Sequence, residues 1–300
     1  MIEALHHAAA LVLAGVCVLV LGHTGLFLRA PRTAVLLWQV TGLTAVLAVL
    51  GLLLGIGLGG YHLGVLPSVA AFCSDLFTGH LPAHVTPPRL LAACAGVALA
   101  LWLLGAQLHW SVRTARSRKR HRELLRLVAR TEGTALVLDH PAAAAYCLPG
   151  PKSRVVISAG TLRLLTPAQL AAVLSHEHAH ARARHHLVLA PFTALHRALP
   201  ENQLARRALA AVELLIELCA DDHAARRHGR ETLADALERF AAAGPRAPAG
   251  TLAAADSHVR LRIDRLRQPP ASPRLLLRAV VLVVSLTALA TPASLFALPV

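Results

Sequence analysis

The chain has 300 residues, of which 55% are hydrophobic and only 15% are charged, yet its formal net charge is +14. A soluble domain of this length is usually about 45–50% apolar and about 25% charged. The composition therefore excludes an intrinsically disordered chain and disfavours a single soluble domain. Aromatic residues make up only 4% of the chain, which disfavours binding of single-stranded nucleic acid by stacking.

Four stretches without charged residues are long enough to cross a bilayer, which takes about 20 apolar residues. They are 8–28, 34–59, 90–110 and 279–300. A cleaved signal peptide is the alternative for the first stretch, but no basic residue precedes it and its apolar segment is long for a signal. We therefore predict an α-helical membrane protein with four spans.

Basic residues near the ends of the spans predict the orientation, because cytoplasmic loops are enriched in Lys and Arg. Arg29 and Arg32 lie between the first two spans, whereas 60–88 contains no Lys or Arg. Six basic residues lie between 113 and 122, directly after the third span. We expect a plasma-membrane protein with both termini outside. The expected organisation is three spans in 1–110 with an outer loop at 60–88, a cytoplasmic domain in 111–278 and the fourth span in 279–300.

The segment 111–278 holds 27 of the 30 basic residues and 14 of the 16 acidic residues, so nearly all of the net charge belongs to it. A nucleic-acid surface and a surface held against anionic lipid are the two explanations. The run 113–122 adjoins a span, where each basic residue gains about 1 kcal/mol from an anionic leaflet. No nucleic-acid-binding motif is present. We expect membrane lipids, and no nucleic acid, among the partners.

Within this segment the pattern predicts short strands and then a helix, an α+β domain. The predicted strands are Leu136–Leu138, Ala145–Leu148 and Arg154–Ser158, with Pro and Gly between them. Thr166 is the expected N-cap of the helix and Pro167 its first residue. The helix continues through AQLAAVLSHEHAHARARHH.

His176, Glu177 and His180 on this helix form an H-E-x-x-H motif. Residues four apart share a helix face, so the two imidazoles can bind one metal ion. Glu177 is rotated by about 100° from His176 and can reach a water molecule on that ion. His178 points away from this face. The motif predicts zinc as the cofactor and Glu177 as the general base of peptide hydrolysis.

A second amphipathic helix, about 205–227, carries further carboxylates. Glu217 is the candidate third ligand, because leucines and an isoleucine around it indicate burial nearby. Asp221 is one turn further on the same face and can fix a ligating histidine through a hydrogen bond, with Asp222 as an adjacent alternative. Three protein ligands leave one position of zinc open, as catalytic sites require. The candidates for a transition-state donor are His223, Arg226 and His258.

The run YCLPGPKSRVVISAGTLRLLTPAQLAAVLSHEHAHARARHH, the later ELCADDHAAR and the closing VRLRIDRL resemble the BlaR/MecR-type integral-membrane zinc metallopeptidases, which are gluzincins. The resemblance extends to the four-span plan and implies a zincin-like protease domain between spans three and four. It implies that His176, His180 and Glu217 bind zinc and that Glu177 is catalytic. The best-known members carry a penicillin-binding sensor after the fourth span, whereas this chain ends at Val300. We therefore do not expect direct β-lactam sensing.

The resemblance favours a zinc-dependent endopeptidase that makes a regulatory, site-specific cut in a cytoplasmic protein such as a transcriptional repressor. An HtpX-type quality-control protease is the alternative enzyme, although 181–216 contains no full-length span. A non-catalytic membrane receptor stabilised by zinc is the alternative outside the enzymes. That receptor would need a fourth protein ligand, such as His178, His185 or Cys219.

In zincins the substrate usually adds as a strand to the edge of the sheet beside the active-site helix. Val155, Val156 and Ile157 are the expected substrate edge strand. An interior strand is the alternative for so short an apolar run.

Overall fold

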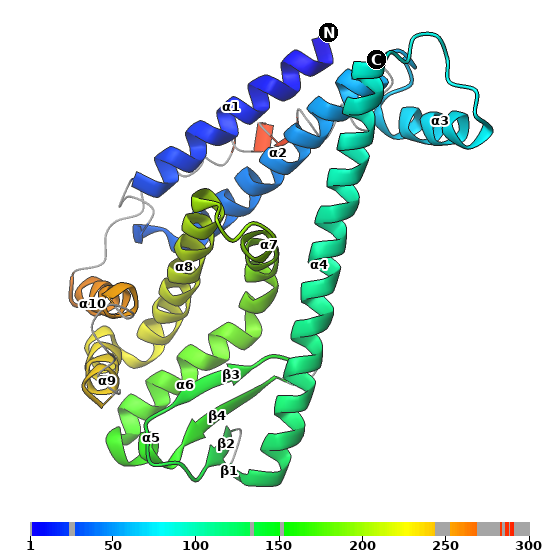
Figure 1. The fold of residues 1–300 in the computed structure, drawn as a ribbon. Helices are drawn as coiled ribbons and strands as arrows, with labels where there is room; N and C mark the ends of the chain where they lie inside the picture. The colour runs from blue at the N-terminus through cyan, green and yellow to red at the C-terminus, as the bar shows by residue number, and fades with distance from the viewer. Residues whose placement is uncertain are drawn as a thin grey trace. The chain divides into compact units, whose positions relative to one another are not determined.

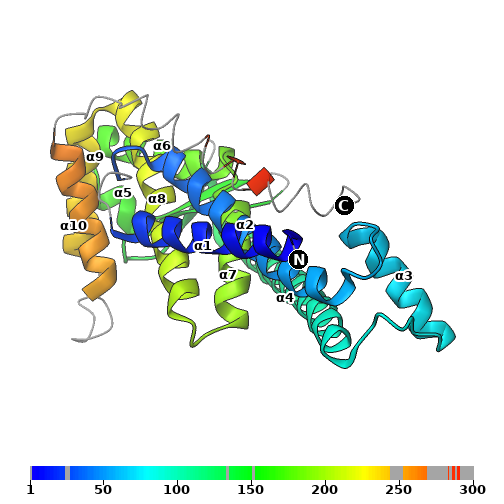
Figure 2. The same ribbon diagram turned by 90° about the horizontal axis from the view of Figure 1, so that it is seen from above.

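The computed structural model describes residues 2–23, 28–132, 135–150, 153–243 and 253–268, together with a few positions between 283 and 290. The chain divides into two compact units. The first comprises 1–108, 195–208 and 273–300, and the second comprises 109–194 and 209–272. Figures 1 and 2 show the helices and strands in two views.

The first unit is built on long apolar helices. α1 (Ile2–His23) packs along α2 (Pro31–Leu58), and α3 (Val65–Thr78) packs against α2 (Figure 1). The first part of α4 (Pro87–Val128) belongs to the same unit. α2 and α4 approach closely where Gly57 faces the backbone of Ala93, because a Cβ at Gly57 has no room there.

Two helices of the described chain, α2 and α4, are long and apolar enough to cross a bilayer, and they suggest membrane association. They contain nearly all of the predicted spans 34–59 and 90–110. α1 covers the predicted span 8–28 as far as His23, with a shorter apolar part. The predicted outer loop 60–88 contains α3, a helix that the sequence did not predict. Most of 279–300 lies outside the described residues, so the four-span topology and the cytoplasmic domain remain predictions.

The second unit contains a four-stranded sheet with the order β1-β2-β4-β3. The strands are β1 (Ala129–Glu132), β2 (Ala135–Leu138), β3 (Ala145–Leu148) and β4 (Arg154–Ser158). β2 and β4 are parallel, whereas β1 and β3 pair antiparallel with their neighbours. The three strands predicted from sequence are confirmed, and β1 is additional.

β4 is an interior strand, so the prediction that Val155, Val156 and Ile157 form the substrate edge strand is wrong. These residues pair with β2 on one side and with β3 on the other. Val155 and Ile157 pack toward α6 (Pro167–Arg182), while Val156 packs with Leu125 of α4 on the opposite face. A strand buried on both faces is typically a continuous apolar run, and the Val and Ile residues of β4 fit that burial without revealing the partner strands. The edge strand beside α6 is β3.

Helix α6 begins as predicted and is fixed by a capping box. The Thr166 hydroxyl accepts a hydrogen bond from the Gln169 backbone, and the Gln169 side chain accepts one from the Thr166 backbone. Pro167 is the first helical residue. Such a cap stabilises a helix by about 1 kcal/mol. It fixes the start of the helix that carries the H-E-x-x-H motif.

Several further helices belong to the second unit. They are α5 (Ala159–Leu164), α7 (His185–Ala198), α8 (Gln203–His228), α9 (Arg230–Ala243) and α10 (Ala253–Arg267), of which α7 and α8 extend into the first unit. α6 packs on α9, and α9 packs on α10. Ala172 of α6, Leu233 of α9 and Leu266 of α10 are fully buried in one core cluster. The same cluster contains Ala224 and Ala225 of α8, so this core brings α6, α8 and α10 within reach of one site.

Candidate active site

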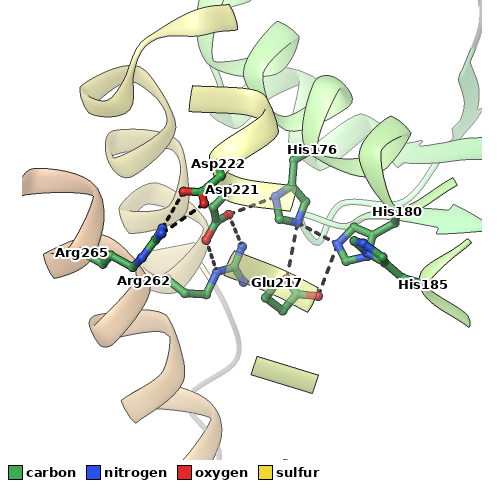
Figure 3. Close-up of polar contacts among 8 residues, drawn as sticks. All are labelled: His176, His180, His185, Glu217, Asp221, Asp222, Arg262 and Arg265. Carbon is green, nitrogen blue, oxygen red and sulfur yellow. Dashed lines mark hydrogen bonds and ion pairs between the residues drawn. The ribbon is translucent and has the colours of Figure 1, made fainter. Parts of the chain in front are cut away.

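The three candidate metal ligands come together at the facing sides of α6 and α8. His176 Nε2 lies 3.1 Å from His180 Nε2. Glu217 Oε2 lies 3.4 Å from His176 Nε2, and Glu217 Oε1 lies 3.4 Å from His180 Nε2. Figure 3 shows the two imidazoles and the carboxylate directed at one another. The sequence therefore identified a group that the fold brings to one point.

The spacing and chemistry of this group fit zinc. Tetrahedral zinc has N and O ligands at about 2.0–2.2 Å, which places neighbouring donor atoms about 3.3–3.6 Å apart. Two of the three distances found here, both 3.4 Å, fall within that range, and the third, 3.1 Å, is slightly shorter. The donor atoms all lie within 4.8 Å of one another. Two imidazoles and one carboxylate form a donor set typical of catalytic zinc, which leaves one position open.

Asp221, not Asp222, lies behind the candidate ligand His176. Asp221 is fully buried, and its Oδ1 lies 3.0 Å from His176 Nδ1, the ring nitrogen opposite the metal-facing one. Asp222 instead forms a salt bridge with Arg265 of α10 at 2.7 Å. Asp221, rather than Asp222, therefore lies where a carboxylate could fix the orientation of the His176 ring.

Arg262 of α10 is a site residue that the sequence analysis did not single out. Its guanidinium donates two hydrogen bonds of 2.8 Å to the Asp221 carboxylate. Its Nη1 also lies 2.9 Å from Glu217 Oε2. The side chain thus joins the candidate ligand Glu217 to the residue behind His176 (Figure 3).

Neighbouring charges explain why the carboxylates of Glu217, which is partly buried, and Asp221, which is fully buried, remain ionised. Burial raises the pKa of Glu217, but the hydrogen bond to His176 and the charge of Arg262 outweigh burial and bring that pKa to about 2. Burial also raises the pKa of Asp221, yet the charge and hydrogen bonds of Arg262 hold it well below its usual value. Both carboxylates are therefore anions. Glu217 can bind a cation, and Asp221 can accept a hydrogen bond from the candidate ligand His176.

The pKa values of the two candidate histidine ligands, His176 and His180, are shifted in opposite directions. Burial lowers the pKa of His176, but its hydrogen bonds to Asp221 and Glu217 outweigh burial and raise the pKa to about 9. Burial lowers the pKa of His180 to about 4, so this ring is neutral at pH 7. Metal binding requires both rings to be neutral, and it therefore displaces a proton from His176.

Glu177 lies beside the candidate ligands and next to β3. Its carboxylate accepts a hydrogen bond from the backbone of Cys147, and burial raises its pKa, to which the charge of Glu217 also contributes. Together with His176, His180, Glu217 and Arg262 it lines a cavity of about 490 Å³. A raised pKa is typical of a carboxylate that exchanges protons during catalysis.

The candidates for a transition-state donor are not among the residues that line this cavity. Arg226 is exposed, and His223 Nε2 lies 2.6 Å from Arg227 Nη1 on the same helix. His258 is partly buried on α10. Their predicted role gains no support from their positions.

The three candidates for the fourth ligand of a closed zinc site are not directed at the candidate metal position. His178 Nδ1 lies 2.7 Å from the carbonyl oxygen of Leu174 on its own helix, and it does not line the cavity. Cys219 is buried and does not line the cavity. His185 does line the cavity, but its Nδ1 lies 2.9 Å from Nδ1 of His180. His185 therefore contacts the side of the His180 ring that is opposite Nε2, the candidate metal-binding atom. These positions favour an open, catalytic metal site.

An H-E-x-x-H motif on α6 and a glutamate on α8 form the arrangement that is typical of a zinc metallopeptidase centre. Residues 113–213 match the profile of peptidase family M48. The matched segment includes the H-E-x-x-H motif and ends before Glu217. The match supports the M48 family, which comprises zinc metallopeptidases, and a metallopeptidase activity. Comparisons with curated proteins and with solved structures found no match.

Proposed function

We propose that the protein is a zinc-dependent membrane endopeptidase. The observation that carries this proposal is the convergence of His176, His180 and Glu217 with Glu177 beside them in one cavity. Three carboxylates, those of Glu177, Glu217 and Asp221, interact with the guanidinium of Arg262. With these groups ionised and both imidazoles neutral, three negative charges and one positive charge leave an excess that a divalent cation balances.

In this proposal His176, His180 and Glu217 hold the zinc ion. Bound there, zinc supplies a Lewis acid that polarises a peptide carbonyl and favours ionisation of water. Glu177 takes the proton of the attacking water and passes it to the leaving amine. Asp221 holds the His176 ring in place, and Arg262 holds the carboxylates of Asp221 and Glu217.

The substrate is proposed to bind as an extended strand along β3, the edge that replaces the wrongly predicted β4. Ala145, Tyr146 and Cys147 of β3 line the cavity. Two contacts join α4 to β3 and to the residue that follows it. His121 Nε2 lies 2.8 Å from the Tyr146 hydroxyl, and Arg122 donates a hydrogen bond of 2.8 Å to the Pro149 carbonyl. An edge held in this way offers backbone groups to a peptide next to Glu177.

The proposed role is a regulatory cut in a cytoplasmic protein, such as a transcriptional repressor, by a protease domain on the inner side of the plasma membrane. The resemblance to BlaR/MecR-type proteins and the basic run 113–122 after a candidate span support this role. Cleavage at one site in one partner is the expected pattern. Cleavage of many misfolded membrane proteins would instead indicate HtpX-type quality control.

Removal of the metal tests the proposed activity. The full chain, purified in detergent, is expected to cleave an unstructured protein such as casein or its own chain. A chelator should abolish that cleavage. About one equivalent of zinc should restore it, because the three protein ligands form a single site and leave one position of the ion open for the reaction. Magnesium serves as the control, since it prefers oxygen ligands. Cleavage that persists without zinc would contradict the proposal.

A further inference from the structure

His185, the first residue of α7, lies directly behind the candidate ligand His180. It is buried, with 7% of its surface exposed. Its Nδ1 lies 2.9 Å from Nδ1 of His180, and the two rings meet edge to face with their centroids 4.7 Å apart. Figure 3 shows His185 on the side of His180 away from Glu217.

The backbone makes a particular turn to place His185 there. α6 ends at Arg182, and Arg184 takes a positive φ of 49°, which is uncommon for a residue with a side chain. The Arg184 amide donates to the Ala181 carbonyl, and the Leu187 amide donates to the Arg184 carbonyl. The chain thus reverses at the end of the motif helix and returns a histidine to the ligand five residues earlier.

The hydrogen bond between the two rings determines where the protons lie. A neutral imidazole has one N–H and one lone pair. If the lone pair on His180 Nε2 faces a metal, the proton of His180 is on Nδ1 and is donated. His185 Nδ1 must then be the acceptor, and the proton of His185 is on its Nε2.

We propose that His185 is a positioning residue that holds His180 in the tautomer and ring orientation that zinc binding requires. The proposal rests on the proposed zinc site. Both histidine ligands then have a partner on the nitrogen away from the metal: Asp221 for His176, at 3.0 Å, and His185 for His180, at 2.9 Å. The two partners differ in charge, because Asp221 is an anion and His185 is a neutral acceptor.

Three substitutions separate this role from simple packing. His185→Asn keeps an acceptor atom where Nδ1 lies, whereas His185→Gln moves the acceptor to the position of Nε2. His185→Phe keeps a ring of similar size without any acceptor. His196→Phe, at a later histidine of α7, is the control, because His196 does not line the cavity that holds the candidate ligands.

The measurement is the zinc dissociation constant of the full chain in detergent, obtained by competition with a chromophoric chelator, with circular dichroism as a check of folding. His185→Phe and His185→Gln are expected to bind zinc about 10–100-fold more weakly than the wild type, the usual effect of losing such a partner. His185→Asn should remain within a few-fold of the wild type, and His196→Phe should match it.

Equal zinc affinities of the Asn and Gln variants would overturn the proposal, as would wild-type affinity in His185→Phe. If His185→Phe fails to fold, the comparison of Asn with Gln still decides. A wild-type protein that binds no zinc would contradict the proposed function itself. Normal zinc binding in the wild type and in every variant would contradict only the role of His185.

Discussion

Replacing Glu177 by Gln is expected to abolish peptide cleavage while zinc stays bound. Gln keeps the size of the side chain but cannot take a proton from the attacking water. Loss of a general base of this kind costs about 10²–10⁴-fold in rate. Glu177 is not one of the three donors that converge on the candidate metal position, so the zinc content should remain at one ion per chain. The rate of cleavage and the bound zinc are measured on the same sample.

Glu201→Gln is the control for this substitution. Glu201 is an exposed carboxylate in the turn between α7 and α8, and it does not line the cavity. Its replacement should leave the rate of cleavage unchanged. Undiminished cleavage in Glu177→Gln would mean that another group accepts the proton, and the assignment of Glu177 would fail.

Replacing Arg262 by Leu is expected to have the largest effect on stability. Asp221 is fully buried, and Arg262 donates two hydrogen bonds to it. Without the guanidinium, Asp221 would remain a buried anion without its main cation, which costs about 3–5 kcal/mol. The loss appears as a lower midpoint of thermal unfolding. Zinc affinity should fall too, because Glu217 loses its ion pair with Arg262.

Arg265→Leu is the matched control on the same helix. Arg265 pairs with Asp222 through a bidentate contact of the same kind, but the Asp222 side chain is 24% exposed whereas that of Asp221 is 0% exposed. Solvent screens this pair, so its loss should cost only about 1 kcal/mol. If both arginine variants lose the same stability, burial of the Asp221–Arg262 pair is not what matters, and the account of α10 is wrong.

A second substitution separates stability from metal binding. Asp221→Asn in the Arg262→Leu background removes the unpaired charge, so part of the lost stability should return. Zinc affinity should stay low, because a carboxylate no longer orients the His176 ring. Recovery of both properties together would show that Arg262 acts on zinc only through overall folding.

The parts of the site that follow from helix periodicity could be predicted from the sequence. His176 and His180 are four residues apart and so share a face, and Asp221 stands in the same relation to Glu217. The capping residues Thr166 and Pro167 set the start of α6 correctly. Each of these features depends on neighbours within one or two turns of the same helix.

The parts that depend on long-range packing could not be predicted. Arg262 is one of four arginines in the short α10, and only the packing of α10 shows which of them faces Asp221. The position of β4 inside the sheet depends on its pairing with β2 and β3, which an apolar run does not reveal. His185 reaches His180 through the positive φ of Arg184, a conformation that the residue type does not suggest.

X-ray absorption at the zinc edge of the zinc-loaded full chain tests the central claim most directly. The account predicts one zinc ion per chain with two imidazole ligands, one carboxylate and one further oxygen ligand from solvent, and no sulfur. That result would establish His176, His180 and Glu217 as an open catalytic centre. A sulfur ligand, a third imidazole or four protein ligands would show a closed structural site and would contradict the account.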